Sequence, residues 1–179
     1  MLAEPGRSLR PVQLGVSSKE GCKAAVHAAR RYLGETSQRR VIFKVDMANA
    51  FNTIRRDVFL AAARERAQGL YALLWQAYSE PSNLFYGDTG LVSATGIQQG
   101  DPFGPALFSL GIDSLTRELE VEFNAWYLDD GTLGDTPEKV LTVILKLVSD
   151  LRRVGLEVNQ RKCELIILNL SREDQIRTG

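Results

Sequence analysis

Two adjacent aspartates, Asp129 and Asp130, lie in the stretch NAWYLDDGTLG, between two short apolar runs that indicate strands. A two-residue hairpin turn needs one Asp followed by Gly, and the Asp130-Gly131 step meets that need. Asp129 is therefore surplus to the turn, and two neighbouring carboxylates repel each other unless a cation lies between them. The pair predicts a cation site. Because Asp is common in turns, an acidic turn without a ligand explains this stretch, taken alone, equally well.

A third aspartate, Asp46, ends a predicted strand over Val41–Asp46, where the sequence alternates and is rich in branched residues. If this strand lies beside the hairpin, two or three carboxylates converge at one edge of a sheet, an arrangement that hard divalent cations stabilise. Mg²⁺ prefers carboxylates together with substrate phosphates. Two such ions about 3.5–4 Å apart can activate an attacking hydroxyl and stabilise the leaving oxygen in phosphoryl transfer.

Two further segments carry candidate binding residues. Phe51 follows Asp46 by five positions, and the loop GIQQGDPFGP contains Gln99 and Gly100 ahead of a predicted helix, whose N-terminus favours anions. A Gly- and Gln-rich loop of this kind can press its backbone against a flat base. The alternatives are a core aromatic at Phe51 and an ordinary helix N-terminus after the loop.

The elements that must position these residues can be predicted from the spacing of apolar residues. Ser17 and Glu20 form a capping-box pattern before a helix that we expect to end at Gly34. Four residues give this helix its predicted apolar face: Cys22, Val26, Ala29 and Leu33. Farther along, two helical pieces separated at Gly69 precede a stop at Pro81.

The remaining pattern predicts a hairpin around the GDTG turn, a helix with Asp101 as N-cap and Pro102 as its first residue, and then the hairpin with the paired aspartates. A helix begins at Thr136 and Pro137 and ends at Gly155. Short strands follow. The order from Val41 is strand, helices, hairpin, helix, hairpin, helix, strand, which favours an α+β fold with helices packed on one face of an antiparallel sheet.

Composition limits the classes of protein. The chain has 179 residues, and its 22 Lys and Arg balance its 22 Asp and Glu. This length suits one domain, or one domain with part of another, and the neutral charge counts mildly against autonomous nucleic-acid binding. No apolar run is long enough to span a bilayer and the N-terminus lacks the apolar stretch of a signal peptide, so we expect no membrane association and an intracellular site, nucleus or cytoplasm. Cys22 and Cys163 are expected to be small buried hydrophobic residues.

Four segments together resemble the motifs of reverse transcriptases, in order and in spacing. Motif A is similar to VIFKVDMANAFNTIRRD, motif B to GIQQGDPFGPALF, motif C to AWYLDDGTLG and motif D to GLEVNQRKCEL. The upstream PVQLGVSSKEGCKAAVHAARRYL resembles the segment before motif A in the non-LTR, LINE-like class. The resemblance implies a polymerase palm with a ferredoxin-like or RRM-like core over residues 41–170, a remnant of the fingers over 1–40 and a polar tail over 171–179.

The resemblance also implies roles for individual residues. Asp46 and Asp129, assisted by the Met47 carbonyl, would bind two catalytic Mg²⁺ ions, with Mn²⁺ as a possible substitute, and Asp130 is the adjacent motif C carboxylate. The other implied contacts are to the incoming nucleotide. Phe51 would exclude a 2′-hydroxyl, Gln99 and Gly100 would contact nucleotide and template, and Lys162 would lie near the triphosphate.

This sequence departs from the family pattern at a few positions. Asn52 stands where many relatives have Asp, and Phe103 where Leu is commoner. Complete fingers and a thumb are not recognised, so we expect them in a longer parent polyprotein. The implied activity is an RNA-directed DNA polymerase acting on an RNA template, a DNA primer and dNTPs. The alternative is a catalytically silent derivative that serves as a binding module.

Overall fold

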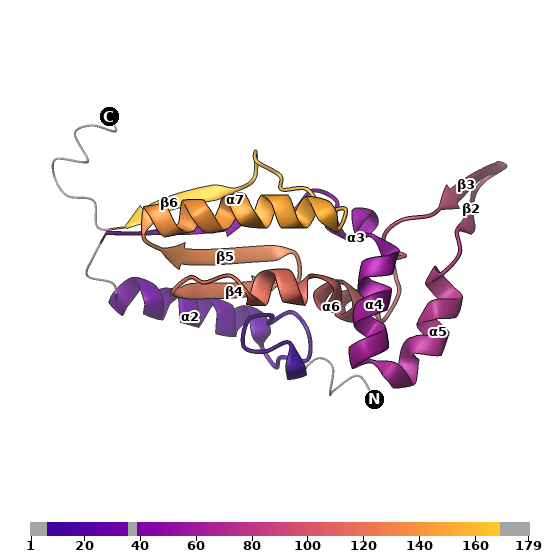
Figure 1. Ribbon diagram of the computed structural model, residues 1–179, viewed down its shortest axis with the longest axis horizontal. Coiled ribbons are helices and arrows are strands. Elements are labelled where there is room, and N and C mark those ends of the chain that lie inside the picture. Colours follow the sequence, from indigo (N-terminus) through magenta and orange to yellow (C-terminus); the bar gives the residue numbers. More distant parts are fainter. Residues whose placement is uncertain (1–6, 36–38, 169–179) are drawn as a thin grey trace.

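The computed structural model describes residues 7–35 and 39–168 and contains a four-stranded antiparallel sheet in the order β4-β5-β1-β6 (Figure 1). Its strands are β1 (Arg40–Val45), β4 (Phe123–Tyr127), β5 (Asp130–Asp135) and β6 (Glu164–Leu168). The predicted first strand is therefore confirmed to within one residue. The predicted polar tail, 171–179, lies outside the described residues.

Helices lie on both faces of this sheet. Leu133 of β5 belongs to the same buried core as Leu147 and Leu151 of α7 (Pro137–Arg153), and α6 (Gly104–Arg117) contacts β4. Neighbouring residues of a strand point to opposite faces. Gly134, next to Leu133, faces the ring of Tyr32 in α2 (Gly21–Glu35). The antiparallel α+β fold is as predicted, with α2 as an addition on the second face.

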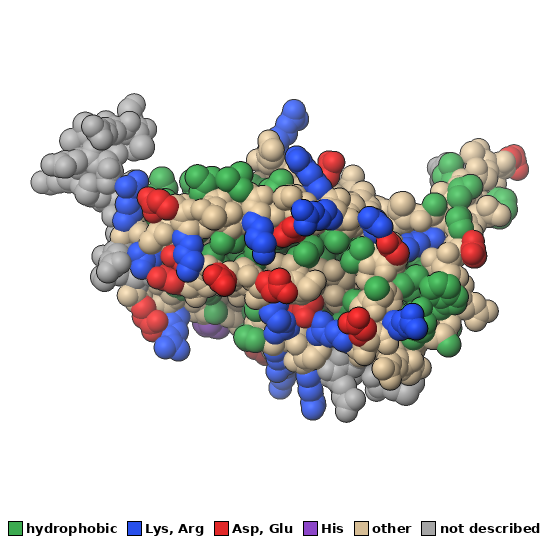
Figure 2. Space-filling view, in the orientation of Figure 1, with side chains coloured by type: hydrophobic (Ala, Val, Ile, Leu, Met, Phe, Trp, Pro, Cys, Tyr) green, Lys and Arg blue, Asp and Glu red, His purple; other side chains and the backbone are tan. Residues whose placement is uncertain are grey.

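The remaining elements lie at one end of the sheet (Figure 1). They are α3 (Ala50–Thr53), α4 (Arg56–Arg66), α5 (Gln68–Tyr78), β2 (Ser82–Tyr86) and β3 (Thr89–Ser93), the last two forming a separate hairpin. Figure 2 shows hydrophobic side chains gathered over α5 and this hairpin, where Trp75, Phe85 and Val92 are exposed. The predicted element order from the first strand to the last is confirmed.

Helix α7 shows why the local predictions succeed. The Thr136 hydroxyl accepts a hydrogen bond from Lys139 N, and Pro137 occupies the first turn, as expected at a helix N-terminus. Val140, Leu147 and Leu151 form its buried face. The helix ends at Arg153, and Gly155 follows with φ +84°. No helix in the described part of the chain is both long and apolar enough to cross a membrane.

Several boundary predictions are wrong. Ser17 and Glu20 both have positive φ, so they form no capping box, and α2 continues through Gly34. The helical break falls at Ala67 rather than Gly69. Helix α6 begins at Gly104, although the Asp101 carboxylate does accept a hydrogen bond from Phe103 N.

The predicted apolar face of α2 is also wrong. Cys22, Val26 and Leu33 are exposed, and the helix instead contacts the sheet through Tyr32, whose ring stacks on Phe123 at 5.2 Å between centroids. Cys163 is partly buried, so the expectation of two buried cysteines fails for Cys22.

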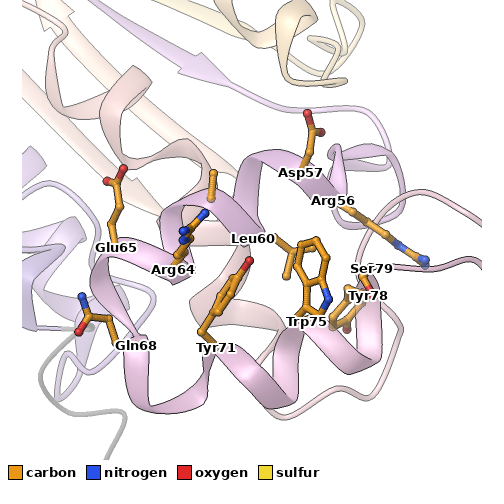
Figure 3. A pocket seen from close by; sticks show the side chains of 11 residues that line it. Arg56, Asp57, Leu60, Arg64, Glu65, Gln68, Tyr71, Trp75, Tyr78 and Ser79 are labelled. Atoms are coloured by element: carbon orange, nitrogen blue, oxygen red, sulfur yellow. The ribbon is translucent and has the colours of Figure 1, made fainter.

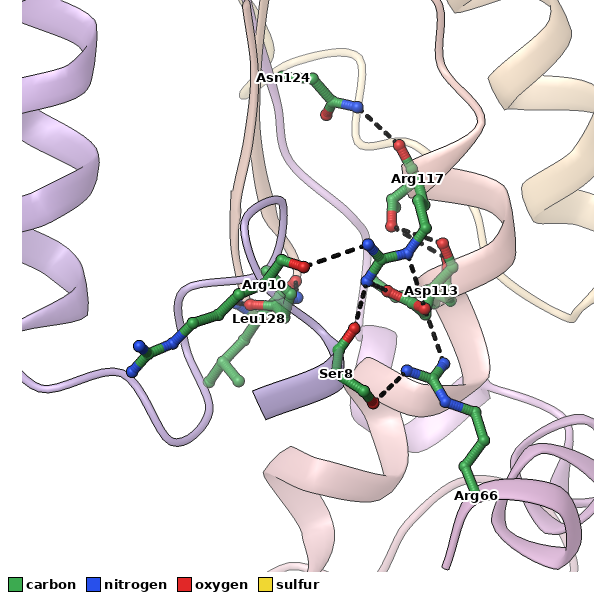
Figure 4. A network of polar contacts seen from close by, with 10 residues as sticks. Ser8, Arg10, Arg66, Asp113, Arg117, Asn124 and Leu128 are labelled. Carbon is green, nitrogen blue, oxygen red and sulfur yellow. Dashed lines mark hydrogen bonds and ion pairs between the residues drawn. The ribbon is translucent and has the colours of Figure 1, made fainter. Parts of the chain in front are cut away.

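The N-terminal segment is fastened to the core by a cluster of charges (Figure 4). The Asp113 side chain is 6% exposed and accepts hydrogen bonds from Arg66 at 2.7 Å and Arg117 at 2.9 Å. The two guanidinium groups also donate to the Ser8 hydroxyl, the Ser8 carbonyl and the Arg10 carbonyl. Leu9, between them, is completely buried, so this segment belongs to the main core.

Candidate active site

The paired strands β1 and β5 bring the predicted carboxylates to one edge of the sheet. Val45 lies opposite Gly131, so Asp46 follows β1 at the place where Asp130 begins β5. Tyr127 pairs with Asp130 across the hairpin, which leaves Leu128 and Asp129 as the turn residues. The condition set for convergence, that the Asp46 strand lies beside the hairpin, is therefore met.

The chemistry of this turn differs from the prediction. The residue with positive φ is Leu128, at φ +57°, and Gly131 lies inside β5. Gly131 faces its strand partner Trp126, since a Cβ at this position would lie 2.6 Å from Trp126 Cη2. The glycine is therefore required by packing of the indole, and the turn prediction was displaced by two residues.

Asp46 is held through its backbone, while one of its carboxylate oxygens has no hydrogen-bond partner in the described part of the chain. Asn159 N donates to Asp46 O at 2.8 Å, and Asp46 N donates to Cys163 Sγ at 3.5 Å. Asp46 Oδ1 is buried and has no hydrogen-bond partner among the described residues. A buried carboxylate oxygen without a donor is costly, and a bound cation is one group that removes this cost.

Asp129 experiences the predicted repulsion. Burial raises the pKa of Asp129 above its ordinary value, and the neighbouring carboxylates of Asp130 and Asp46 raise it further. Each effect disfavours the charged form. The site therefore holds negative charge that a divalent cation would neutralise.

The carboxylates of this site fit the way in which phosphoryl-transfer sites bind Mg²⁺. Among residues 7–35 and 39–168, no group of three or more His, Cys, Asp or Glu side chains is arranged to hold a metal. Mg²⁺ is usually bound by one or two carboxylates plus substrate phosphates rather than by a cage of protein ligands. Asp46 and Asp129 match that smaller requirement.

A cavity of about 640 Å³ opens beside Asp46 and Asp130. Its lining joins Asp46 and Asp130 to the cations of Lys44, Arg161 and Lys162, with Cys22 and Val26 contributed by α2. Lys44 pairs with Glu164 at 3.0 Å. The structure therefore brings Lys162 to the same cavity as two of the predicted carboxylates, whereas Asp129, Phe51, Gln99 and Gly100 are not part of its lining.

Phe51 and the loop before α6 are joined to each other. The Phe51 ring stacks on Phe108 with centroids 4.6 Å apart, and Ile97 N donates to Phe51 O at 2.7 Å. Gly96 has φ +70°, and a Cβ there would lie 2.3 Å from Asn52 O. Gln99 and Gly100 are exposed beyond this contact.

Sequence reasoning missed two residues that hold this loop, Tyr78 and Arg56. The Tyr78 hydroxyl donates to the Asp101 carboxylate and accepts a hydrogen bond from Gln98 N. Burial and the Asp101 carboxylate raise the pKa of Tyr78 to about 12. Both residues lie more than a dozen positions from the loop, so no local pattern indicates the contact.

Arg56 lies over the Tyr78 ring at 5.4 Å and donates to Gly96 O and Ser93 Oγ, at 3.1 and 2.9 Å. Arg56 and Tyr78 also line a second cavity of about 680 Å³ between α4 and α5. The side chains of Tyr71 and Trp75 line the same cavity (Figure 3). This cavity contains none of the predicted site residues.

Solved structures share this fold. Apo telomerase from Candida tropicalis superposes with a TM-score of 0.67 at 12% identity, covering 90% of this chain and 35% of that one. Telomerase from the same organism in complex with a TWJ fragment of telomeric RNA gives a TM-score of 0.65 at 10% identity, covering 93% and 34%. The fold is that of a polymerase palm.

Sequence comparison gives the family. The pattern of the family described as reverse transcriptase (RNA-dependent DNA polymerase) matches residues 2–177, so the chain belongs to the reverse transcriptase family. The 132 kDa protein of the retrotransposable element SLACS from Trypanosoma brucei gambiense is 31% identical over 142 residues, which cover 69% of this chain. The Pol polyprotein of the type-2 retrotransposable element R2DM from Drosophila melanogaster is 27% identical over 173 residues, or 86% of this chain.

The predicted family is thus confirmed, including its non-LTR class. The chain spans only 11% of the SLACS protein and 16% of the R2DM polyprotein. Reverse transcriptase domains generally use divalent metal ions, which agrees with the donor set described above.

Proposed function

We propose that this chain is the palm of an RNA-directed DNA polymerase that adds dNTPs to a primer 3′-hydroxyl. One observation carries the proposal. In a chain of the reverse transcriptase family, Asp46 at the end of β1 and Asp129 in the turn before β5 converge, and a buried oxygen of Asp46 finds no hydrogen-bond partner among the residues described. Residues 41–170 would form the palm and residues 1–40 a remnant of the fingers.

In this proposal Asp46 and Asp129 hold two Mg²⁺ ions, or Mn²⁺, with the Met47 carbonyl as a further ligand. When bound, the ions activate the primer hydroxyl and stabilise the charge of the leaving pyrophosphate. Asp130, which faces the cavity, adds negative charge to the site and helps to retain the cations.

The cationic side of the cavity suits a triphosphate. Lys162 lines the same cavity as Asp46 and Asp130, and its ammonium group would stabilise the leaving pyrophosphate or donate a proton to it. Phe51 would lie under the sugar, held by its stacking on Phe108, and would exclude a 2′-hydroxyl. Gln99 and the open backbone at Gly100 would contact the nucleotide and the template.

The proposed reaction needs an RNA template, a DNA primer and dNTPs. The relatives belong to much longer proteins, so we propose that fingers and thumb elements of a longer parent polyprotein complete the grip on these substrates. We also propose an intracellular site, in the nucleus or the cytoplasm, where such substrates are found.

Primer extension tests the proposal directly. A DNA primer on an RNA template is incubated with dNTPs and either Mg²⁺ or Mn²⁺, using the wild-type chain, Asp129→Ala and Asp150→Asn. Asp150 lies on α7 and pairs with Lys146 and Arg153, so its variant controls for loss of an acidic side chain. We expect extension by wild type and Asp150→Asn and none by Asp129→Ala.

Equal extension by Asp129→Ala would refute the assignment of Asp46 and Asp129 as the metal ligands. No extension by any of the three proteins would favour the alternative for this chain, a catalytically silent module that keeps the palm fold.

A further inference from the structure

A buried glutamine, Gln13, holds the backbone of the residue that precedes Asp129. The Gln13 side chain is 1% exposed. Its Oε1 accepts hydrogen bonds from Leu128 N at 2.8 Å and Gly15 N at 2.9 Å, and its Nε2 donates to Leu128 O at 3.1 Å. One side chain therefore satisfies both backbone polar groups of Leu128.

These two groups belong to different peptide planes. The Leu128 N–H lies in the plane before its Cα, and the Leu128 carbonyl lies in the plane after it. Because φ and ψ are the rotations between the two planes, bonds to both groups restrict both angles. Gln13 therefore acts on the conformation of Leu128 and on the direction in which the chain enters Asp129.

Leu128 needs such a restraint, since it has φ +57°. The left-handed region is unfavourable for residues that carry a Cβ, and such a conformation persists only where the surroundings fix it. The position of Gln13 is fixed in turn by its main chain. Leu14 N donates to Trp126 O at 2.7 Å, and Trp126 N donates to Val12 O at 2.8 Å.

A second feature of the same segment agrees with this arrangement. A Cβ at Gly15 would lie 2.7 Å from Leu128 N and 2.7 Å from Leu128 Cδ2. Only glycine allows the segment to approach the turn so closely. Gln13 and Gly15, which sequence patterns leave without a role, thus meet the same residue of the turn.

We propose that Gln13 is a positioning residue, which holds Leu128 in its left-handed conformation so that the Asp129 carboxylate is presented beside Asp46. The inference rests on the proposed function in so far as these carboxylates bind the metal. The contact joins parts of the chain that are 115 residues apart, so it also connects the N-terminal segment to the proposed metal ligands Asp46 and Asp129.

Mn²⁺ binding to the whole chain tests this inference without requiring polymerisation. Mn²⁺ is titrated into the protein, and the free ion is followed by electron paramagnetic resonance. The decisive variant is Gln13→Met, which keeps the length of the side chain but removes all three hydrogen bonds. Loss of residues that orient a ligand lowers metal affinity by about 10–100-fold, and we expect this range here.

Three control variants separate positioning from loss of stability. Gln76→Met makes the same exchange on an exposed part of α5. Leu9→Ala loosens the packing of the same N-terminal segment but leaves the bonds of Gln13 to Leu128 in place. Asp129→Asn removes the negative charge of the proposed ligand. Gln76→Met and Leu9→Ala should each retain the wild-type Mn²⁺ affinity.

A second readout follows Leu128 directly by NMR. A positive φ brings the amide hydrogen close to its own Hα and gives a strong intraresidue nuclear Overhauser effect. We expect this signal in the wild type, Leu9→Ala and Gln76→Met, and its loss in Gln13→Met. Slow exchange of the Leu128 amide with solvent should be lost in the same variant.

The outcomes distinguish the inference from the proposed function. If Gln13→Met keeps both the Leu128 signal and the Mn²⁺ affinity, or if Leu9→Ala weakens binding equally, the positioning role is refuted. The assignment of Asp46 and Asp129 as metal ligands is refuted instead if the wild type binds no Mn²⁺ at a saturable site, or if Asp129→Asn leaves that site intact. The restraint on Leu128 is then decided by the NMR signal alone, and its loss in Gln13→Met supports the restraint.

Discussion

The indole of Trp126 lies against Gly131, its partner across the β4–β5 pair, so closely that a Cβ on Gly131 would be 2.6 Å from Trp126 Cη2. Trp126 is completely buried, and its Nε1 donates to Asn124 Oδ1 at 2.9 Å. The hairpin that carries the paired aspartates is therefore seated on a rigid aromatic side chain.

Gly131→Ala is expected to destabilise the protein by about 1–3 kcal/mol, because the added methyl group must displace a buried ring. Urea unfolding measures the change. Gly34→Ala is the matched control, since a Cβ at Gly34 meets no atom of the described residues within 4 Å. That helical exchange should stabilise by about 0.5–1 kcal/mol. Equal effects of the two substitutions would contradict the packing role of Gly131.

Asp113→Asn is expected to lower the free energy of unfolding by about 2–3 kcal/mol, because Asp113 is the common acceptor for Arg66 and Arg117. Urea unfolding checks the total, and hydrogen exchange should show faster opening around Leu9. The control Glu35→Gln breaks an exposed pair with Arg31 and should change stability by less than about 0.5 kcal/mol. Unchanged exchange around Leu9 would show that the cluster does not anchor the N-terminal segment.

The raised pKa of Tyr78 predicts a specific loss of stability in alkali. The folded state favours the neutral phenol, so its contribution is complete below the ordinary pKa of 10.0 and is lost as the pH rises toward about 12. Thermal unfolding between pH 9 and pH 12 should therefore show a smaller decline in Tyr78→Phe than in the wild type. Tyr71→Phe, which removes the hydroxyl of a half-buried tyrosine on the same helix, is the control and should decline as the wild type does.

Phe51→Val is expected to admit ribonucleotides, which lowers the preference for dNTPs over rNTPs by about tenfold or more. Because the ring also stacks on Phe108, the same variant should lose about 1–2 kcal/mol of stability. Incorporation of each sugar is compared by primer extension, and urea unfolding measures stability. Phe85→Val, on a residue 78% exposed, is the control for both. Unchanged sugar discrimination in Phe51→Val would remove Phe51 from the nucleotide site.

Asp129→Asn is expected to raise the melting temperature at neutral pH in the absence of metal, because burial and the nearby carboxylates disfavour the charged form of Asp129. The gain should vanish as the pH falls through the raised pKa toward the ordinary value of 3.8, where wild-type Asp129 is protonated too. Asp57→Asn should behave oppositely, because the hydrogen bond from Arg55 lowers the pKa of Asp57. A lower melting temperature for metal-free Asp129→Asn would show that the charged Asp129 carboxylate does not destabilise the folded protein.

Local patterns predicted most of the fold. Strand alternation found β1, apolar runs on either side of turn residues found both hairpins, and Thr136 with Pro137 marked the start of α7. The buried face of α2 was missed because it depends on Tyr32 meeting Phe123, a contact between distant segments. A contact of this kind produces no periodic pattern of apolar residues from which it could be predicted.

The candidate site was predicted in the same uneven way. The convergence of Asp46 with the Asp129 turn was predicted on the condition that their strands are neighbours, and the pairing of β1 with β5 meets this condition. The roles of Phe51, Gln99, Gly100 and Lys162 stay predictions. The turn itself was misplaced because Gly131 makes room for the Trp126 indole, while the residue with positive φ is Leu128. Gln13 was missed because its partners lie at the far end of the chain.

The pairing of residues 12–14 with Trp126 also determines the order in which the molecule can be assembled. Contacts between distant parts of a chain form slowly, because a long loop must close before they are made. On the ribosome, the segment around Gln13 emerges before β4, and more than a hundred further residues must follow before its partner strand exists. The restraint on Leu128 therefore cannot form until β4 and the turn after it have been synthesised.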